Sequence, residues 1–470
     1  GAVVMPLVPA AAQGTDLTKP PKLGPPPALS LPPVVTRRLP NGLQVLIIEH
    51  HELPLLDAVL VVKTGGEANP AGRPGVANMT ARLLDEGTTT RSSLEIADQE
   101  AYLGISIDAS SGWDASRVAL HTPTAQLDSA LALFADVVLH PSFPAREFDR
   151  VQQEALTELM QIPDRGPTIA SRAFARILFG AAHPYGQPLS GTEASVRSMT
   201  RDELAAFHAT YFRPNNATLI LVGDVRPDDI MARVTRLFGA WAAGDVPQHP
   251  VPGVQARAAT RVYLIDKPGA AQSSFRIGSV SAPRSTPDYF AIQVMNTILG
   301  GAFTSRLNEN LRETHGYTYG AGSGFDMRRA PGPFVASAEV VSAKSDSALI
   351  EFMRELRNIR EPVPQKELNK AKRYLELSLP GEFETTTDIA NQFVPVIAYG
   401  LPLDYYNGAV RQIDHVSQAD VQRVARKYVD PAYLTIVIVG DRASIEPKLE
   451  ATHIAPVEIR AMNGDKPRSP

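Results

Sequence analysis

The chain has 470 residues, of which 44% are hydrophobic and 20% charged, with a formal net charge of −4. This length exceeds what one hydrophobic core supports and predicts at least two domains, while the charge lacks the strongly basic character that nucleic-acid binding requires. No apolar run approaches the roughly 18 residues of a membrane span, and the absence of cysteine excludes disulfides, thiolate zinc sites and cysteine nucleophiles.

Residues 1–34 are predicted to lie outside the folded domains. Residues 2–14, AVVMPLVPAAAQG, form an apolar run that ends in three alanines and resembles the end of a secretory signal peptide whose charged start is not in the sequence. We therefore expect a periplasmic or otherwise exported bacterial protein; the alternative is a merely apolar tail. Residues 18–35 contain seven prolines, which favour an extended leader, either a spacer or an arm lying across a partner.

Residues 35–243 form a first domain in which apolar periodicity alternates between strand and helix. Two alternating segments, residues 41–50 and 56–66, are predicted to pair as a hairpin. The elements that follow in chain order are predicted as helices at 75–86 and 93–103, strands at 106–108 and 113–122, helices at 125–139, 145–161, 168–178 and 201–211, and a strand at 218–223. Because the strand pairs read as hairpins, we predict an α+β fold with antiparallel-rich sheets packed against helices.

Residues 244–260 are rich in proline and small residues and predict a linker. Residues 261–454 then repeat the first domain. Anchors at both ends of the repeat share an offset of 217 residues, from Val45 to Val262 and from Tyr211 to Tyr428, and between them SGWD at 111–114 returns as SGFD at 323–326. A common offset at two distant anchors indicates a tandem duplication. The polar residues 455–470 are predicted to be a frayed tail.

The helix predicted at 75–86 was the best candidate for a metal site. A zinc site on a helix needs two histidines one turn apart and a neighbouring glutamate as general base. Here Asn78 and Arg82 occupy the one-turn spacing and Ala81 lies between them. Asparagine is a poor zinc ligand, alanine accepts no proton, and arginine places a fixed positive charge where the cation would be. The ten histidines include no pair three or four residues apart, so we predict no metal site in this chain.

Residues 299–325 combine a glycine pair, a helical run, a break at Gly316 and an alternating strand. Arg312 is therefore placed at a helix end, and Tyr319 follows across a turn. A guanidinium and a phenol on the two sides of one turn can converge on a carbonyl oxygen or on the oxyanion that it becomes. The structural alternative is a surface arginine paired with a carboxylate and a tyrosine half buried in a sheet.

Several motifs together resemble the pitrilysin-type (inverzincin) family of zinc metallopeptidases, which includes the mitochondrial processing peptidase and bacterial two-subunit peptidases. The resemblance covers about residues 35 to 450 and implies two tandem homologous domains. Besides the duplication, the motifs that carry it are HPYG with a following GT at 183–192, FRPNNATLILVGDV at 212–225, and LGG, RL and LRETHGYTYG within 299–320.

In that family one domain carries the inverted zinc motif HxxEH with a second glutamate downstream, and another domain or subunit supplies an arginine and a tyrosine seven residues apart. The motif positions fall on residues 78–82 of this sequence, so both histidines and the glutamate are missing, while Glu158 stands at the downstream position. The resemblance implies that Arg312 and Tyr319 are the arginine and the tyrosine. Glu158 is hypothesised to bond Arg82 where the metal would be.

The resemblance implies the non-catalytic subunit of a heterodimeric zinc metalloendopeptidase, inactive alone. Zinc is expected in a homologous partner that carries HxxEH, where it would activate water, while Arg312 and Tyr319 would bind the peptide and stabilise the oxyanion. Gly300 and Gly301 would let a substrate pass close to the backbone, or would only form a turn beside the helix. The alternative function is a catalytically dead scaffold or binding protein. The short LGGAFTSRL segment, in place of a long glycine-rich loop, favours the bacterial heterodimer type.

Overall fold

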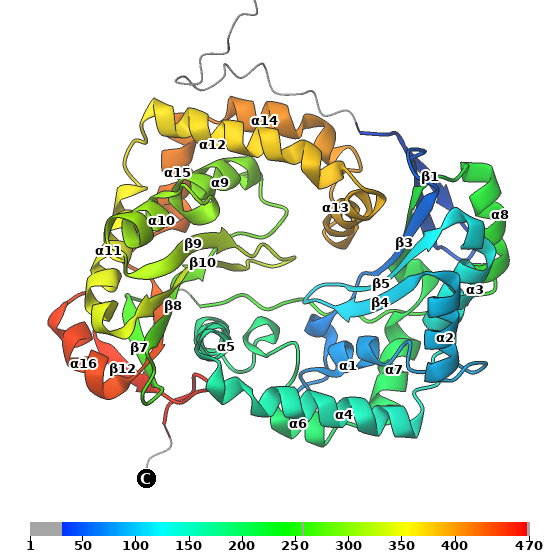
Figure 1. The fold of residues 1–470 in the computed structure, drawn as a ribbon, viewed down its shortest axis with the longest axis horizontal. Coiled ribbons are helices and arrows are strands. Elements are labelled where there is room, and N and C mark those ends of the chain that lie inside the picture. The colour runs from blue at the N-terminus through cyan, green and yellow to red at the C-terminus, as the bar shows by residue number, and fades with distance from the viewer. Residues whose placement is uncertain (1–30, 256–257, 468–470) are drawn as a thin grey trace, which may run out of the picture.

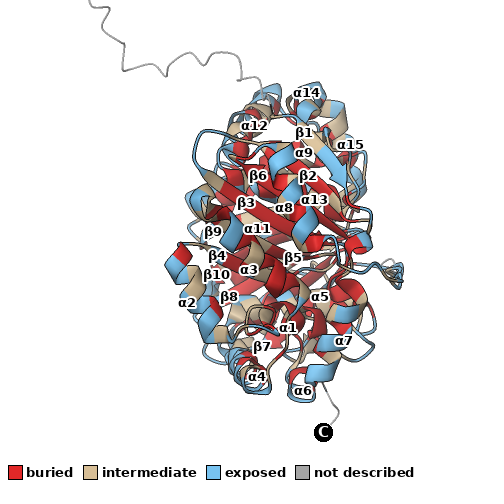
Figure 2. Ribbon diagram, turned by 90° about the vertical axis from the view of Figure 1, so that its right-hand side faces the viewer, coloured by how far each residue is buried: buried red, intermediate tan, exposed pale blue. Residues whose placement is uncertain are grey.

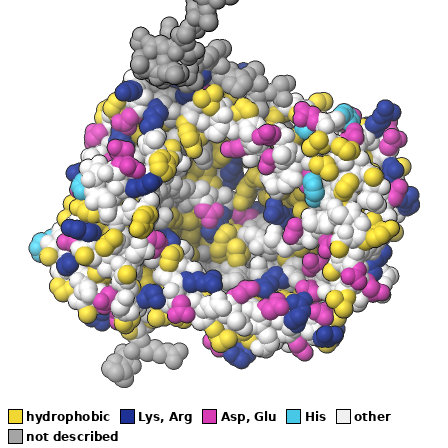
Figure 3. Space-filling model, viewed as in Figure 1, with side chains coloured by type: hydrophobic (Ala, Val, Ile, Leu, Met, Phe, Trp, Pro, Cys, Tyr) yellow, Lys and Arg dark blue, Asp and Glu magenta, His cyan; other side chains and the backbone are white. Residues whose placement is uncertain are grey.

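The computed structural model describes residues 31–255 and 258–467. The signal-like segment and most of the proline-rich leader lie outside these ranges. The chain forms two halves, each built on one six-stranded sheet. Figure 1 shows the halves on either side of a central space, and Figure 3 shows the surface hollowed at that place. Among the described residues, no helix combines the length and apolarity needed to cross a membrane.

The first sheet has the strand order β1-β2-β6-β3-β5-β4. Its strands are β1 (Val34–Arg38), β2 (Gln44–Glu49), β3 (Leu55–Val62), β4 (Ser106–Ser111), β5 (Ser116–Pro123) and β6 (Ala217–Gly223). Strand β6 is buried at every position, and Figure 2 shows the burial extending over β3. A strand that is apolar throughout is expected where both faces of a sheet are covered.

The hairpin predicted for residues 41–50 and 56–66 is wrong. Strand β6, from the end of the half, lies between β2 and β3, parallel to β2 and antiparallel to β3. Both strands of the supposed hairpin are apolar on two faces, so each can pair with any buried strand. Alternation along the chain does not reveal which strand is inserted between two others.

The second sheet has the order β12-β7-β11-β8-β10-β9. Its strands are β7 (Arg261–Asp266), β8 (Gln272–Val280), β9 (Thr318–Phe325), β10 (Pro333–Val341), β11 (Thr435–Gly440) and β12 (Val457–Arg460). In the first sheet Gln44 lies opposite Thr218, and in the second Arg261 lies opposite Thr435. Both members of the pair are thus shifted by the same 217 residues in the sequence, which confirms the duplication and the α+β class.

The frayed tail predicted for residues 455–470 is also wrong in part. Strand β12 belongs to it and pairs in parallel with β7, at the sheet edge where β1 lies antiparallel to β2 in the first half. All four residues of β12 are half buried. An edge strand has a neighbouring strand on one side only, so it can be short and mostly polar. In a sequence, such a segment is easily mistaken for a frayed tail.

Helices cover both sheets and lie mostly where the periodicity predicts them. The predictions at 93–103 and 201–211 match α2 and α7, whose starts are fixed by capping boxes at Ser92 and Thr200. In the first half the helices are α1 (Val76–Arg82), α2 (Ser93–Leu103), α3 (Leu127–Leu139), α4 (Ala145–Met160), α5 (Gly166–Phe179), α6 (Glu193–Arg197), α7 (Arg201–Tyr211) and α8 (Pro227–Phe238). In the second half they are α9 (Tyr289–Asn296), α10 (Arg306–Asn308), α11 (Ser345–Asn358), α12 (Gln365–Ser378), α13 (Thr386–Ala398), α14 (Ala409–His415), α15 (Gln418–Tyr428) and α16 (Arg442–Ala451).

Each half contributes one helix to the other half's sheet. Helix α5 packs on β8 and β11, and α13 packs on β3 and β6. Phe174 of α5 belongs to one hydrophobic cluster with Tyr263 of the second sheet, while Phe393 of α13 belongs to another with Val59 of the first sheet. Neither sheet therefore has both faces covered by its own half.

We expect Phe174→Ala to lower the free energy of unfolding by about 3–5 kcal/mol, because the side chain is only 3% exposed. Calorimetry should show one transition moving to lower temperature, since α5 ties the two halves together. Tyr102→Ala, at a side chain that is 87% exposed, should change the stability by less than about 0.5 kcal/mol. Two separate transitions, only one of them shifted, would contradict the exchange of helices as a source of cooperativity.

Candidate functional site

Helix α1 presents the positions where the zinc motif was sought. It starts after Gly75, which has a φ of 99°, and a Cβ on Gly75 would lie 2.9 Å from the Cα of Gly191. A side chain is therefore excluded there both by the backbone conformation and by space. The glycine fixes the start of α1, and with it the positions of Asn78, Ala81 and Arg82 along the helix.

Arg82 and Glu158 form a two-pronged ion pair between the ends of α1 and α4. Nη1 and Nη2 of Arg82 donate to Oε2 and Oε1 of Glu158 over 2.9 and 3.1 Å, which confirms the hypothesised bond. The side chains are 27% and 61% exposed, so the pair adds little stability. It does occupy both oxygens of the carboxylate that would otherwise be a metal ligand.

The residues at these positions do not fit zinc. The Arg82 guanidinium places a positive charge where the cation would lie, and Ala81 is buried and has no acid or base to offer. Across the described ranges, no group of three or more His, Cys, Asp or Glu side chains is placed to hold a metal ion. This part of the molecule is a closed ion pair rather than an open coordination site.

The second candidate pair lies where the π-helical segment η7 (Glu309–Thr314) meets β9. Gly316, with a φ of 62°, ends the helix, and its N–H donates to the carbonyl of Arg312 over 3.0 Å. A left-handed glycine bonded to the last turn is a common way to end a helix. The helix thus breaks at Gly316, as the sequence predicted, and a main-chain bond holds the turn between Arg312 and Tyr319.

Tyr319 faces outward from that turn, whereas Arg312 is only half exposed, at 36% of its side chain. The guanidinium carbon of Arg312 lies 4.6 Å from the centre of the Phe303 ring, a cation–π distance, and its Nε lies 3.4 Å from Oε1 of Glu313. Tyr319 is 90% exposed, so it is not the half-buried tyrosine of the structural alternative. Within the described chain no hydrogen bond joins the pair, and the Tyr319 hydroxyl has no partner.

Gly300 and Gly301 end the π-helical segment η6 (Thr297–Gly301). A Cβ on Gly300 would lie 2.3 Å from the backbone N of Ser323 in β9, and one on Gly301 would lie 2.8 Å from Nδ2 of Asn296. Packing within the chain therefore already requires Gly300, whereas at Gly301 the nearest atom is the end of a side chain that can move. They also line a cavity of 520 Å³ beside β9, and their role in substrate binding stays a prediction.

Sequence reasoning missed a network that joins the halves, in which an exposed arginine bonds buried carboxylates. The backbone N–H of Arg329, between β9 and β10, donates to Oδ2 of Asp114 over 2.8 Å, and its Nη1 donates to Oε1 of Glu67 over 3.2 Å. Tyr185 donates its hydroxyl to Oδ1 of Asp114 over 2.7 Å. The repeated SGWD and SGFD motif was the signal, because it places Asp114 at the end of a hairpin that meets the second half.

Burial raises the pKa of Glu67 to about 7, although Arg329 and the N–H of Gly65 oppose the rise. Since its folded-state pKa lies above its ordinary value, the folded protein binds more protons than the unfolded chain between these two values. The stabilising contribution is full below about pH 4.5 and is lost as the pH rises through about 7.

We expect stability to fall by up to about 3 kcal/mol between about pH 5 and pH 8 through this group. Glu67→Gln should remove that slope, because an amide does not titrate in this range, and its carbonyl can still accept the Gly65 N–H. Urea unfolding at several pH values measures the slope. Glu52→Gln, at an exposed position, should keep the wild-type slope; equal slopes in all three proteins would contradict the role of Glu67.

Two family models match the chain. Residues 44–193 match "Insulinase (Peptidase family M16)", and residues 198–375 match "Peptidase M16 inactive domain". An uncharacterized zinc protease of Mycobacterium tuberculosis is 27% identical over 434 residues, which cover 90% of this chain and 98% of that protein. A non-peptidase homolog of Helicobacter pylori is 23% identical over 404 residues, which cover 85% and 92% respectively.

Solved structures show the same fold. An M16 peptidase inactive domain from Pseudomonas fluorescens superimposes with a TM-score of 0.81 at 29% identity, over 87% of this chain and 98% of that one. A protease from Helicobacter pylori superimposes with a TM-score of 0.82 at 22% identity, over 87% and 100%. The α+β fold with two homologous halves is thereby confirmed.

The duplicated fold, with an arginine–carboxylate pair at the metal-motif positions, defines a zinc-peptidase-like protein that lacks the peptidase's metal motif. The chain belongs to peptidase family M16. The family expected from the HPYG, FRPNN and LRETHGYTYG motifs is therefore confirmed. The matches to the inactive domain and to the non-peptidase homolog support a non-catalytic M16-like protein.

Proposed function

We propose that this chain is the non-catalytic subunit of an exported bacterial heterodimeric zinc metalloendopeptidase, and that it lends Arg312 and Tyr319 to the active site of a homologous partner bearing HxxEH. The observation that carries the proposal is the placement of two hydrogen-bond donors on the two sides of one turn, with the Tyr319 hydroxyl exposed and the Arg312 guanidinium held over the Phe303 ring. Tyr319 makes no hydrogen bond among the described residues and is almost fully exposed, so the fold gains little from holding it there.

The division of labour follows from the chemistry that each subunit carries. The partner's zinc, once bound, supplies activated water for peptide hydrolysis. Arg312 of this chain binds a backbone carbonyl of the peptide, and its stacking on Phe303 keeps the guanidinium in place. Tyr319 donates its hydroxyl to the oxygen on which negative charge develops, where a positioned donor is worth about 2.7–4 kcal/mol.

The shape of the molecule supports closure by a second subunit. The face seen in Figure 3 is hollowed at its centre, and β9, which carries Tyr319, borders that space in Figure 1. Strand β9 is also the last strand of its sheet. A homologous subunit with the same concave shape would enclose a peptide between the two.

Co-expression with the HxxEH-bearing homologue of the same genome tests the proposal. Cleavage of a fluorogenic unstructured peptide and zinc content are measured for this chain, for the homologue and for the mixture. We expect activity, with about one zinc per heterodimer, only in the mixture. A stable complex without activity would overturn the proposal and favour a peptidase-like scaffold. The Arg82–Glu158 pair and the similarity to a non-peptidase homolog are also compatible with a scaffold.

A further inference from the structure

A pocket of 590 Å³ lies among η6, α10, η7, α11 and α12. Neither Arg312, Tyr319, Gly300 nor Gly301 lines it. Its volume is in the range of small-molecule sites, about 300–1,000 Å³. Two of its walls, η6 and η7, are π-helical, a rare conformation that is frequent at functional sites.

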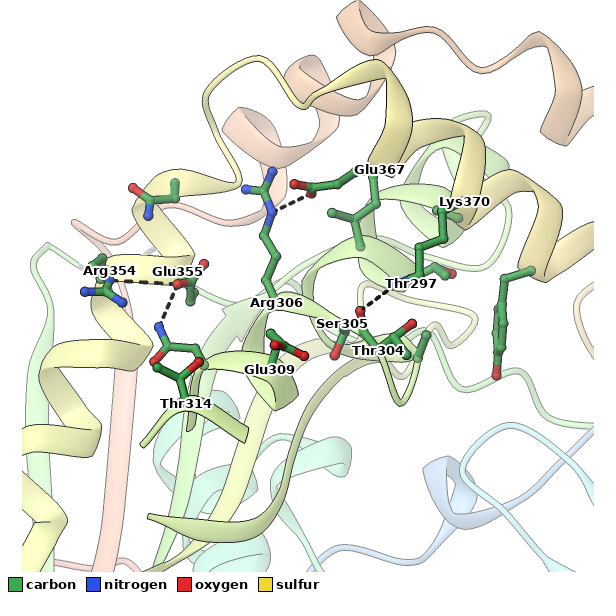
Figure 4. A pocket seen from close by; sticks show the side chains of 16 residues that line it. Thr297, Thr304, Ser305, Arg306, Glu309, Thr314, Arg354, Glu355, Glu367 and Lys370 are labelled. Atoms are coloured by element: carbon green, nitrogen blue, oxygen red, sulfur yellow. Dashed lines mark hydrogen bonds and ion pairs between the residues drawn. The ribbon is translucent and has the colours of Figure 1, made fainter. Parts of the chain in front are cut away.

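Two cations in this pocket have unused hydrogen-bond donors. Figure 4 shows Arg306 extending toward Glu367, to which its Nε donates over 2.8 Å. The two terminal nitrogens of the same guanidinium have no hydrogen-bond partner in the described part of the chain. Lys370 donates one N–H to the carbonyl of Thr304 over 3.2 Å, so an ammonium with three donors keeps two of them.

Acceptors lie beside these donors. Glu309 follows Arg306 by one helical turn, is exposed and has no ion-pair or hydrogen-bond partner for its carboxylate among the described residues. Asn310 is buried and donates its amide to Glu351 and Glu355, while its Oδ1 is left without a donor. Within one turn of helix the pocket thus offers free donors on Arg306 and a carboxylate on Glu309 without a partner, and the ammonium of Lys370 is added from α12.

The charges that line the pocket balance. Its lining holds Arg306, Arg354 and Lys370 together with Glu309, Glu355 and Glu367. Arg306 is paired with Glu367, and Arg354 lies 3.8 Å from Glu355. Among the described residues this leaves Lys370 and Glu309 without an ion-pair partner, and a simple anion or a simple cation would satisfy only one of them. A zwitterion satisfies both. Residues three apart on a helix have Cβ atoms about 5–6 Å apart, and two or three extended peptide residues span about 7–11 Å, a distance that the long Arg306 and Glu309 side chains can accommodate.

We propose that this pocket binds short peptides with free termini, taking the carboxylate at Arg306 and Lys370 and the ammonium at Glu309. Ile298, Ala302, Ala371 and Tyr374 add apolar and aromatic surface for the peptide body. The site belongs to this chain alone and needs no partner, so it stands apart from the proposed subunit function.

Calorimetric titration of the full chain with triglycine tests the site. The termini are then blocked one at a time, in N-acetyl-triglycine and in triglycine amide. Glu309→Gln should weaken binding of triglycine at least tenfold and leave N-acetyl-triglycine unchanged, because that peptide has no ammonium to lose. Lys370→Gln should weaken triglycine at least tenfold and leave the amide unchanged.

Matched controls lie outside the pocket. Lys366→Gln changes an exposed lysine one turn before Lys370 on the same helix, and Glu384→Gln changes an exposed glutamate; both should bind triglycine like the wild type. Circular dichroism checks that every variant is folded. The proposal would be overturned if about 10 mM triglycine gave no heat of binding. It would also be overturned if N-acetyl-triglycine amide, which is blocked at both ends, bound as tightly as triglycine. Because no partner is present, failure here is distinct from failure of the subunit function.

Discussion

Arg312→Ala and Tyr319→Phe, each made in the complex with the HxxEH-bearing partner, are expected to lower kcat by about 10²- to 10³-fold and to leave the zinc content unchanged. In the proposed complex, Tyr319→Phe removes the donor aimed at developing negative charge, and Arg312→Ala removes the cation that holds the peptide carbonyl in the reactive geometry. Neither touches the ion pair at Arg82 or the core, so the fold should be unaffected. Steady-state kinetics on the fluorogenic peptide, with zinc measured by atomic emission, gives both quantities.

Conservative controls separate the role of this turn from a general effect of surface changes. Arg357→Ala on α11 and Tyr102→Phe on α2 alter exposed residues of the same types and should keep wild-type turnover. Unchanged turnover in both Arg312→Ala and Tyr319→Phe would show that the pair has no part in catalysis. Zinc loss that accompanies the fall in kcat would instead indicate a defect in assembly.

The double substitution Asn78→His and Arg82→His is expected to create a zinc site in this chain alone. The new histidines would lie one turn apart on one face of α1, and removal of the guanidinium frees both oxygens of Glu158. Three protein ligands with a water molecule suit zinc, and micromolar binding corresponds to about 8 kcal/mol. Zinc retained after dialysis, compared with the wild type, measures the gain.

Two variants show whether the ligands are the intended ones. Asn78→His alone keeps the Arg82–Glu158 pair and should bind no zinc. Adding Glu158→Gln to the double variant should lower the affinity at least tenfold, because a carboxylate ligand is replaced by an amide. If the folded double variant holds no more zinc than the wild type, α1 and α4 do not retain the spacing of the family's metal site.

Local patterns were sufficient where one segment decides its own structure. Helices α2 and α7 begin and end as predicted, and each starts at a capping box formed by residues of the helix itself. The Arg82–Glu158 bond could be foreseen because the motif positions of a known family bring those two residues together. The turn between Arg312 and Tyr319 could be foreseen from Gly316, since a left-handed glycine ends a helix by itself.

Other features depend on which remote segments pair with each other, and nothing in either segment's sequence identifies its partner. The insertion of β6 between β2 and β3, and the edge strand β12 within the presumed tail, follow from which apolar surfaces meet after folding. The exchange of α5 and α13 between the halves is of the same kind: both helices are ordinary amphipathic segments in sequence. The sequence indicated that a substrate could approach the backbone at Gly300. In the structure, the backbone of Ser323 lies so close that a side chain at Gly300 is excluded.

The sequence by itself determined which chemistry this protein carries: a duplicated α+β chain of the M16 type, with no histidine pair for zinc and with an arginine and a tyrosine on the two sides of one turn. Only the tertiary structure decided that Tyr319 is exposed and that Arg306, Glu309 and Lys370 line one pocket. The reason is physical: residue types set the available charges and donors, but their effect depends on distance and burial, which arise when remote segments pack together.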